Sequence, residues 1–346
     1  MNSHLIPTHP PSRILVIRRD NIGDLVCTTP LLQQLRLTFP LARLDVLVNT
    51  YNQPVLENCA FVSNVYCYTK LKHRSREVSV AQALLDRLKL LLHLRKNAYD
   101  IVLLPNESDL ARTIKLAKLI GARKIIGLNT NKSFSAKLDV AITPNGFHAV
   151  EAASSLMQYF KDTSLPPAVI VRPNMQAQAV ATQCIAISPE QKLIALHISA
   201  RKPRQRWPAQ RYIELVQQLN QRDSSLRFLL LWSPGAADNP LHPGDDEKAV
   251  EIIKSTEGRG VIPYSTRQLG ELIGALSICK GMICSDGGAM HLAAGLGLPI
   301  VCLFGNSSVA RWHPWGVRYV ALQKMSGDVA DVTVAEVLHA FNDLNI

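Results

Sequence analysis

The chain has 346 residues, 47% of them hydrophobic and 19% charged, a net charge of +11 and a mean hydropathy of +0.06. This balance excludes a largely disordered chain, and no apolar run reaches the roughly 18–20 residues that a membrane-spanning helix needs. The polar, proline-containing start lacks the apolar stretch of a signal peptide, so the sequence predicts a cytoplasmic protein. Its length predicts two domains.

In the first half, short apolar runs alternate with helical patterns. Strands are expected at residues 13–18, 44–48, 101–104, 124–128 and 140–142. Helices are expected at residues 30–38, 80–96 and 110–120. Apolar strands that alternate with helices are typical of a parallel sheet covered on both faces.

The second half repeats this scheme. Strands are expected at residues 193–198, 226–232, 281–284 and 299–304, and helices at 208–222, 245–255 and 289–295. Prolines 166, 167 and 173 mark a junction near residues 165–175. The prediction is an α/β protein with two Rossmann-like domains in tandem, at residues 1–168 and 175–346.

The positive charge is concentrated in one half, since residues 1–175 carry +10 of the net +11. Such a field suggests an anionic partner, which could be a phosphorylated glycolipid, a membrane surface or nucleic acid. Aromatic residues make up only 6% of the chain. Because single-stranded nucleic acid is usually held by aromatic stacking, no nucleic-acid partner is expected.

A leucine stripe marks the helix expected at residues 80–96, which follows the basic residues Lys70, Lys72, Arg74 and Arg76. Leu84, Leu85, Leu88 and Leu92 fall along one face of that helix. Two interpretations are open. The face could lie on an anionic membrane surface, or it could pack on the sheet with its charges in water.

Several familiar motifs do not occur in the sequence. There is no P-loop, no complete GxGxxG after the first strand, no HExxH and no GxSxG. No Asp-x-Asp pair is present to bridge a metal and a diphosphate. The sequence therefore predicts neither a bound metal nor a cofactor.

A carboxylate follows the first strand in the loop Arg19-Asp20-Asn21-Ile22-Gly23-Asp24. Ligands collect at the carboxyl ends of strands in open α/β sheets. Asp24 could act there as a general base for an acceptor hydroxyl, or it could only cap the helix that follows. Spacing alone does not separate these alternatives, and Asp20 is expected to be structural.

The segment from Met282 to His291 reads as a strand, a glycine turn and a helix start. Gly287 and Gly288 would let a ligand approach the backbone, and free N–H groups at a helix N-terminus bind phosphate. Asp286 could hold sugar or ribose hydroxyls. His291 could face the same site or could be a hydrogen-bonded core residue.

A basic loop follows the strand expected at residues 193–198. It carries the four cations Arg201, Lys202, Arg204 and Arg206. At the carboxyl end of a strand they could neutralise a leaving diphosphate, although a solvated basic loop is the simpler interpretation. Trp207 and Pro208 are expected to pack and to start the next helix.

Three segments together resemble the glycosyltransferase family 9 enzymes, the lipopolysaccharide heptosyltransferases. They are RILVIRRDNIGDLVCTTPLL, RQRWPAQRY and MICSDGGAMHLAAGLGLPIVCLFG. The resemblance spans nearly the whole chain. It implies the B-type glycosyltransferase fold, with ADP-heptose bound mainly by the second domain and a lipopolysaccharide inner core bound by the first.

The resemblance also implies roles for individual residues. Asp24 matches the catalytic base of the family, and inversion at the sugar would need no bound metal. Asp286, Gly287, Gly288 and His291 match the donor-binding signature, with Arg201, Lys202, Arg204 and Arg206 as candidate phosphate ligands. Arg18, Arg19 and Gly23 are expected on the acceptor side. Contact with the inner-membrane surface is expected to be peripheral.

Two positions depart from the family pattern. Well-known members carry a lysine two positions before the tryptophan, where this chain has Gln205, and Asp-Thr-Gly is common where it has Asp-Gly-Gly. These differences bear on the donor sugar and the core position more than on the enzyme class. The alternatives are transfer with another donor or acceptor, a nucleotide-sugar epimerase or hydrolase, or a non-enzymatic protein that binds anionic glycans.

Overall fold

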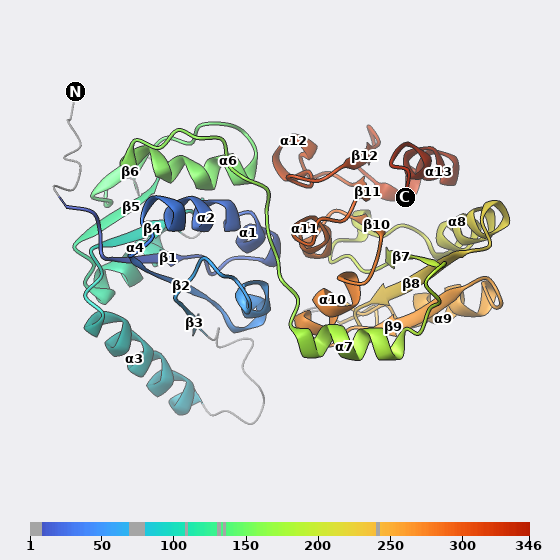
Figure 1. The fold of residues 1–346 in the computed structure, drawn as a ribbon, viewed down its shortest axis with the longest axis horizontal. Coiled ribbons are helices and arrows are strands. Elements are labelled where there is room, and N and C mark those ends of the chain that lie inside the picture. The colour runs from blue at the N-terminus through green and yellow to red at the C-terminus, as the bar shows by residue number, and fades with distance from the viewer. Residues whose placement is uncertain (1–8, 69–79, 108–109, 130–132, 134–135, 240–242) are drawn as a thin grey trace. The chain divides into compact units, whose positions relative to one another are not determined.

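The structure is a computed structural model that describes residues 9–68, 80–107, 110–129, 133, 136–239 and 243–346. The chain divides into two compact units, residues 1–169 and 170–346. Each unit contains a six-stranded parallel sheet with helices (Figure 1). The basic segment with Lys70, Lys72, Arg74 and Arg76 lies outside the described residues.

The first unit contains the sheet of strands β1 to β6. Its strands are β1 (Arg13–Ile17), β2 (Arg43–Asn49), β3 (Asn64–Tyr68), β4 (Ile101–Leu104), β5 (Lys124–Leu128) and β6 (Val140–Ile142). Its helices are α1 (Ile22–Val26), α2 (Thr29–Thr38), α3 (Val80–Lys96), α4 (Leu110–Ile120) and α6 (Ala149–Ser154), with 3-10 helices at Thr50–Leu56 and Ser155–Phe160. The strand order is β3-β2-β1-β4-β5-β6.

The second unit repeats this design. Its strands are β7 (Lys192–His197), β8 (Leu226–Trp232), β9 (Val261–Ser265), β10 (Gly281–Ser285), β11 (Ile300–Phe304) and β12 (Tyr319–Gln323). Its α-helices are α7 (Met175–Cys184), α8 (Ala209–Arg222), α9 (Asp246–Ser255), α10 (Leu269–Leu276), α11 (Gly288–Gly295), α12 (Val309–Trp312) and α13 (Val334–Asp343). Two 3-10 helices lie at Pro203–Gln205 and Val329–Asp331. The strand order is β12-β11-β10-β7-β8-β9.

The two sheets share one topology. Counted from its own first strand, each runs 3-2-1-4-5-6, which is the Rossmann order. The connections therefore change direction between β1 and β4 in the first unit, and between β7 and β10 in the second. Ligands bind in this fold at the carboxyl ends of the two strands that flank such a switch point. The loops after β1 and β4, and after β7 and β10, are thus the places to look for a site.

The strands in the interior of both sheets were predicted, whereas β3, β9 and β12 were not. All three are edge strands that pair on one side only. Most of their residues are only partly buried or exposed. An edge strand does not need the continuous apolar run that makes a central parallel strand visible in a sequence.

The leucines of α3 are a second difference. Of the two interpretations, the one in which they pack on the sheet is wrong, because Leu84, Leu85, Leu88 and Leu92 are each 50–52% exposed. The helix instead buries Ala83 and Leu94. Among the described residues, no helix is both long enough and apolar enough to cross a membrane.

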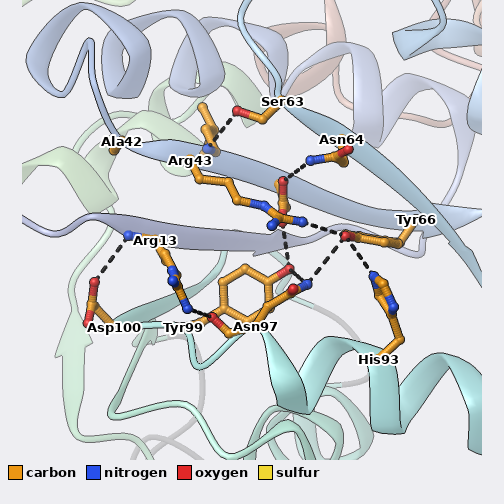
Figure 2. A network of polar contacts seen from close by, with 12 residues as sticks. Arg13, Ala42, Arg43, Ser63, Asn64, Tyr66, His93, Asn97, Tyr99 and Asp100 are labelled. Atoms are coloured by element: carbon orange, nitrogen blue, oxygen red, sulfur yellow. Dashed lines mark hydrogen bonds and ion pairs between the residues drawn. The ribbon is translucent and has the colours of Figure 1, made fainter.

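A buried polar network ties α3 and the start of β4 to the sheet (Figure 2). Asp45 of β2 is fully buried and accepts hydrogen bonds from the hydroxyl of Tyr99 (2.7 Å) and from Asn64 Nδ2 (2.9 Å), and it pairs with Arg43 Nε (2.9 Å). Burial and this carboxylate raise the pKa of Tyr99. Arg43 also donates to the hydroxyl of Tyr66 (2.8 Å), which contacts His93 Nε2 of α3 at 3.2 Å. The network fixes which side of α3 faces the sheet.

Candidate functional site

Asp24 lies at the switch point of the first unit, in the first turn of α1. Its Oδ2 accepts from the backbone N (3.2 Å) and the Nδ2 (2.9 Å) of Asn21, which forms a capping box. Its Oδ1 accepts from Arg18 Nη2 at 3.0 Å. The helix-capping interpretation of Asp24 is therefore correct as a description of its contacts. A carboxylate has about four acceptor positions, so these three bonds leave room for another donor.

Arg18 joins the two strands of this switch point. Its Nη1 donates to the carbonyl of Pro105, just after β4, at 2.8 Å. The same nitrogen lies 3.2 Å from Asp20 Oδ2, so Asp20 has the structural role expected of it. Only 5% of the Arg18 side chain is exposed, against 17% for Asp24. Arg18 is thus a buried anchor that orients Asp24.

Residues from β2, from the 3-10 helix Thr50–Leu56 and from β3 support the loop after β1. Asn49 Nδ2 donates to the carbonyls of Arg19 and Asp20, and the backbone N of Ile22 donates to the hydroxyl of Tyr51 (3.2 Å). The guanidinium of Arg19 lies 4.6 Å from the ring centre of Tyr68. Gly23 is buried within α1. Arg19 is a partly exposed cation of the same loop.

In the second unit, a partly buried carboxylate lies at the corresponding switch point. Asp286 follows β10, and its Oδ2 accepts from Gln205 Nε2 at 3.1 Å and from the hydroxyl of Ser307. Gln205 comes from the loop after β7, and Ser307 follows β11. Burial raises the pKa of Asp286, while the bond from Ser307 and the charge of Lys202 act in the opposite direction. Three loops therefore meet at this carboxylate.

The glycine pair lies directly after Asp286. A Cβ built on Gly287 would meet no atom within 4 Å, so the space beside this backbone is open. Gly287 is the N-cap of α11 in an extended conformation, with φ 165°. The N-terminus of α11 therefore offers backbone N–H groups that a ligand can approach closely. No neighbouring atom of the protein would block a side chain at Gly287. The open space beside this glycine is therefore consistent with room for a ligand.

His291 lies one turn further along α11 and is buried, with 4% of its surface exposed. Its ring packs edge-on against that of Trp312, with 6.0 Å between the ring centres. This packing matches the core interpretation of His291 more closely than direct contact with a ligand. Its proximity to Gly288 still lets it support the first turn of α11.

The cations of the basic loop fall into two groups. Arg201, Lys202 and Arg204 are exposed. Arg206 is held by the protein itself, because it donates to the carbonyl of Ala200 (2.8 Å) and pairs with the buried Asp245 (3.2 Å). Next to it, Trp207 is fully buried and donates to the carbonyl of Val332 (2.9 Å), which anchors the end of the loop.

A titratable cluster lies under this loop. Burial, and then the charge of Lys248, lower the pKa of His197 to about 4. Burial also lowers the pKa of Lys248 to about 8, while Asp245 acts in the opposite direction. Lys248 Nζ donates to the carbonyl of Ile198 at 3.0 Å and lies 5.0 Å from the ring centre of Tyr212. The cluster fixes the carboxyl ends of β7 and β8.

Some residues of the two sites were not singled out from the sequence. Asn49, Ser307 and Gln323 contact the site loops from strands or turns far away in the chain. Polar residues at strand ends gave a weak signal for them, but their partners depend on strand order. Within the described ranges, no group of three or more His, Cys, Asp or Glu side chains is arranged to hold a metal.

Two Rossmann-type units in tandem, each with polar side chains at its switch point, place this chain among the B-type glycosyltransferase folds. The chain belongs to glycosyltransferase family 9 (heptosyltransferase), whose model matches residues 87–338. It is thus a heptosyltransferase-like glycosyltransferase.

Individual relatives agree with this assignment. Lipopolysaccharide heptosyltransferase 3 of Escherichia coli is 25% identical over 312 residues, which cover 85% of this chain and 82% of the relative. Two solved structures share the fold. ADP-heptose lps heptosyltransferase II of E. coli has a TM-score of 0.76 and 21% identity over 96% of this chain and 98% of that one. E. coli heptosyltransferase WaaC with ADP has a TM-score of 0.76 and 18% identity over 96% and 99%.

Proposed function

We propose that this protein transfers heptose from ADP-heptose to a hydroxyl of a lipopolysaccharide inner core, with inversion at the anomeric carbon. Membership of family 9 supports the enzyme class, and relatives named for lipopolysaccharide heptosyl transfer support the substrate pair. The observation that carries the proposal is that each unit has a polar site at its own switch point. A carboxylate with spare acceptor capacity lies in the first unit, and an open helix N-terminus beside Asp286 lies in the second.

In this proposal the acceptor binds the first unit. The hydroxyl donates to Asp24, and the carboxylate takes its proton as the oxygen attacks the anomeric carbon. Arg18 and Asn21 keep the carboxylate oriented, while Arg19 is the cation available to an anionic group on the acceptor. The net charge of +10 over residues 1–175 favours a phosphorylated acceptor at an anionic inner-membrane surface.

The donor binds the second unit. As the new bond forms, the bond between the anomeric carbon and the β-phosphate oxygen breaks, and ADP leaves. Backbone N–H groups of Gly287 and Gly288 and the exposed cations Lys202, Arg201 and Arg204 stabilise the charge on the departing diphosphate. Asp286 holds sugar hydroxyls, and His291 supports the first turn of α11. Arg206 keeps the loop folded rather than contacting phosphate. We infer that no metal ion or cofactor takes part.

The test is release of ADP from ADP-heptose by purified protein, with and without a heptose-deficient lipopolysaccharide. Release that depends on the acceptor would establish the reaction. Release without any acceptor would indicate a hydrolase, and conversion of ADP-heptose without release of ADP would indicate an epimerase. If a folded protein released nothing, this donor–acceptor pair would be rejected, and a panel of other nucleotide sugars would then identify the donor.

A further inference from the structure

An apolar face on α3 lies open to solvent. Leu84, Leu88 and Leu92 are spaced by four residues, and Leu85 adjoins them, so all four fall within an arc of about 100°. Each is 50–52% exposed, although leucine side chains in a folded domain are usually buried. The opposite side of the helix holds the buried Ala83, Leu94, which packs in the core with residues of the sheet, and His93, which contacts Tyr66 of β3. The exposed stripe is therefore a second apolar face, separate from the one that packs.

Positive charge borders this stripe. Lys96 and Lys89 fall within about 40° of its edge on the helical wheel, and both are exposed. On the helical wheel Arg95 falls within the arc of the stripe, and its Nη1 donates to the carbonyl of Leu119 at 3.2 Å. Leu119 belongs to α4, is 46% exposed and extends the apolar surface onto that helix. The acidic residue Asp86 lies on another side of α3, where it accepts from Gln82 at 2.9 Å.

The packing beneath α3 is also apolar and incomplete. A cavity of about 260 Å³ lies between α3, Leu47 of β2 and Leu116 of α4. Leu88 lines this cavity and also belongs to the exposed stripe. The helix thus presents hydrocarbon surface on two sides that the described residues do not cover completely.

We propose that this leucine face of α3 docks on an anionic lipid bilayer, with the leucines at the boundary of the acyl chains and Lys89, Arg95 and Lys96 on lipid phosphates. Leucines flanked by cations on one helix face are the composition of interfacial helices. A protein partner fits less well, because lysine is depleted and leucine contributes few hot spots at protein–protein interfaces. A second copy would bring an equally positive surface, which disfavours self-association through this face.

The test is co-sedimentation of the full-length protein with vesicles at low ionic strength. One set of vesicles is phosphatidylcholine, and the other is phosphatidylcholine mixed with phosphatidylglycerol. The protein should bind the mixed vesicles and lose binding as salt is raised. The triple variant L84Q/L88Q/L92Q should bind at least about tenfold more weakly, and K89E/K96E should weaken binding to the mixed vesicles without removing any leucine.

Two variants control for general changes of surface. L37Q/L41Q changes leucines of the same unit that are 71% and 99% exposed, and K254E/K280E makes the same charge change in the second unit. Both should bind like wild type, and all variants should keep the wild-type melting temperature. No binding by wild type, or equal loss in the control variants, would overturn the proposal, as would a protein partner that competes with vesicles for the face. Vesicle binding needs no turnover, so its result can be interpreted even if the proposed glycosyl transfer is not found.

Discussion

Gln205 and Asp286 are 81 positions apart in the chain, and the Nε2 of Gln205 donates to the Oδ2 of Asp286 across 3.1 Å. This bond joins the loop after β7 to the loop after β10 at the switch point of the second unit. Gln205 is 7% exposed, and Gly305 lets the loop approach, because a Cβ there would lie 3.0 Å from the carbonyl oxygen of Arg204. At this position well-known relatives have a positively charged lysine. This chain has the neutral Gln205, which donates a hydrogen bond to the Asp286 carboxylate.

We expect Gln205→Ala to lower kcat/KM by about 10- to 100-fold, because a hydrogen bond to a charged group such as the Asp286 carboxylate contributes about 1.5–3 kcal/mol. Gln205→Glu should lower it further, since a second carboxylate would face Asp286. Steady-state kinetics of ADP release measure both effects. Gln218→Ala, which removes a glutamine bonded to Glu214 on α8, is the control and should behave like wild type. Wild-type kinetics for both Gln205 variants would show that this bond does not position the donor.

Asp24→Asn should reduce transfer by about 10²–10⁴-fold, the range for loss of a general base, while ADP-heptose still binds. The amide keeps the shape of the side chain but cannot take a proton at neutral pH. Single-turnover rates and donor affinity by calorimetry separate the two effects. Asp20→Asn is the matched control, because Asp20 also contacts Arg18 but lies outside the proposed chemistry. A folded Asp24→Asn protein with rapid turnover would exclude Asp24 as the base.

Lys202 and Arg206 are cations of the same loop, but we expect their replacement to have different effects, on donor binding for Lys202 and on stability for Arg206. Lys202→Ala should weaken donor binding several-fold and leave the melting temperature unchanged, because this side chain is exposed and its charge acts on Asp286. Arg206→Ala should lower the free energy of unfolding by about 3–5 kcal/mol, because it leaves the buried Asp245 without its ion-pair partner. Urea unfolding and donor titration on both variants measure this contrast. If Arg206→Ala instead weakened donor binding and Lys202→Ala lowered stability, Arg206 would be assigned to the donor site.

His197 predicts a pH dependence of stability. Its pKa in the folded protein is about 4, against about 6.5 in an unfolded chain. Between these values the unfolded state binds more protons, so the stability contributed by His197 is complete above pH 6.5 and is lost as the pH falls toward 4. At pH 5 the loss should be about 2 kcal/mol.

Urea unfolding at pH 7 and pH 5 tests this expectation. His197→Gln should show a smaller difference between the two pH values than wild type. His339→Gln changes an exposed histidine of α13 and should leave the difference unchanged. An unchanged difference in His197→Gln would mean that other groups cause the acid sensitivity.

The sequence alone predicted the two α/β halves, the central strands and the loops that carry the site. This was possible because a central parallel strand is buried on both faces, so it appears as a continuous apolar run such as RILVI or IVCLF. The polar residues that come soon after central strands, in the following loop or first helical turn, therefore fall at the carboxyl ends of those strands, and Asp24 and Asp286 are among them. The family resemblance rests on the same segments.

The tertiary structure decided which of these residues meet. The neighbours of β1 and β7 depend on crossover connections, and no local pattern in the chain encodes that β4 and β10 lie beside them. The same crossovers bring Pro105 to Arg18, and Gln205 and Ser307 to Asp286. The leucines of α3 show most clearly what the sequence alone could not decide, because their spacing fits either a buried or an exposed face. The packing of Leu94 and the contact between the Tyr66 hydroxyl and His93 Nε2 turn that stripe toward solvent.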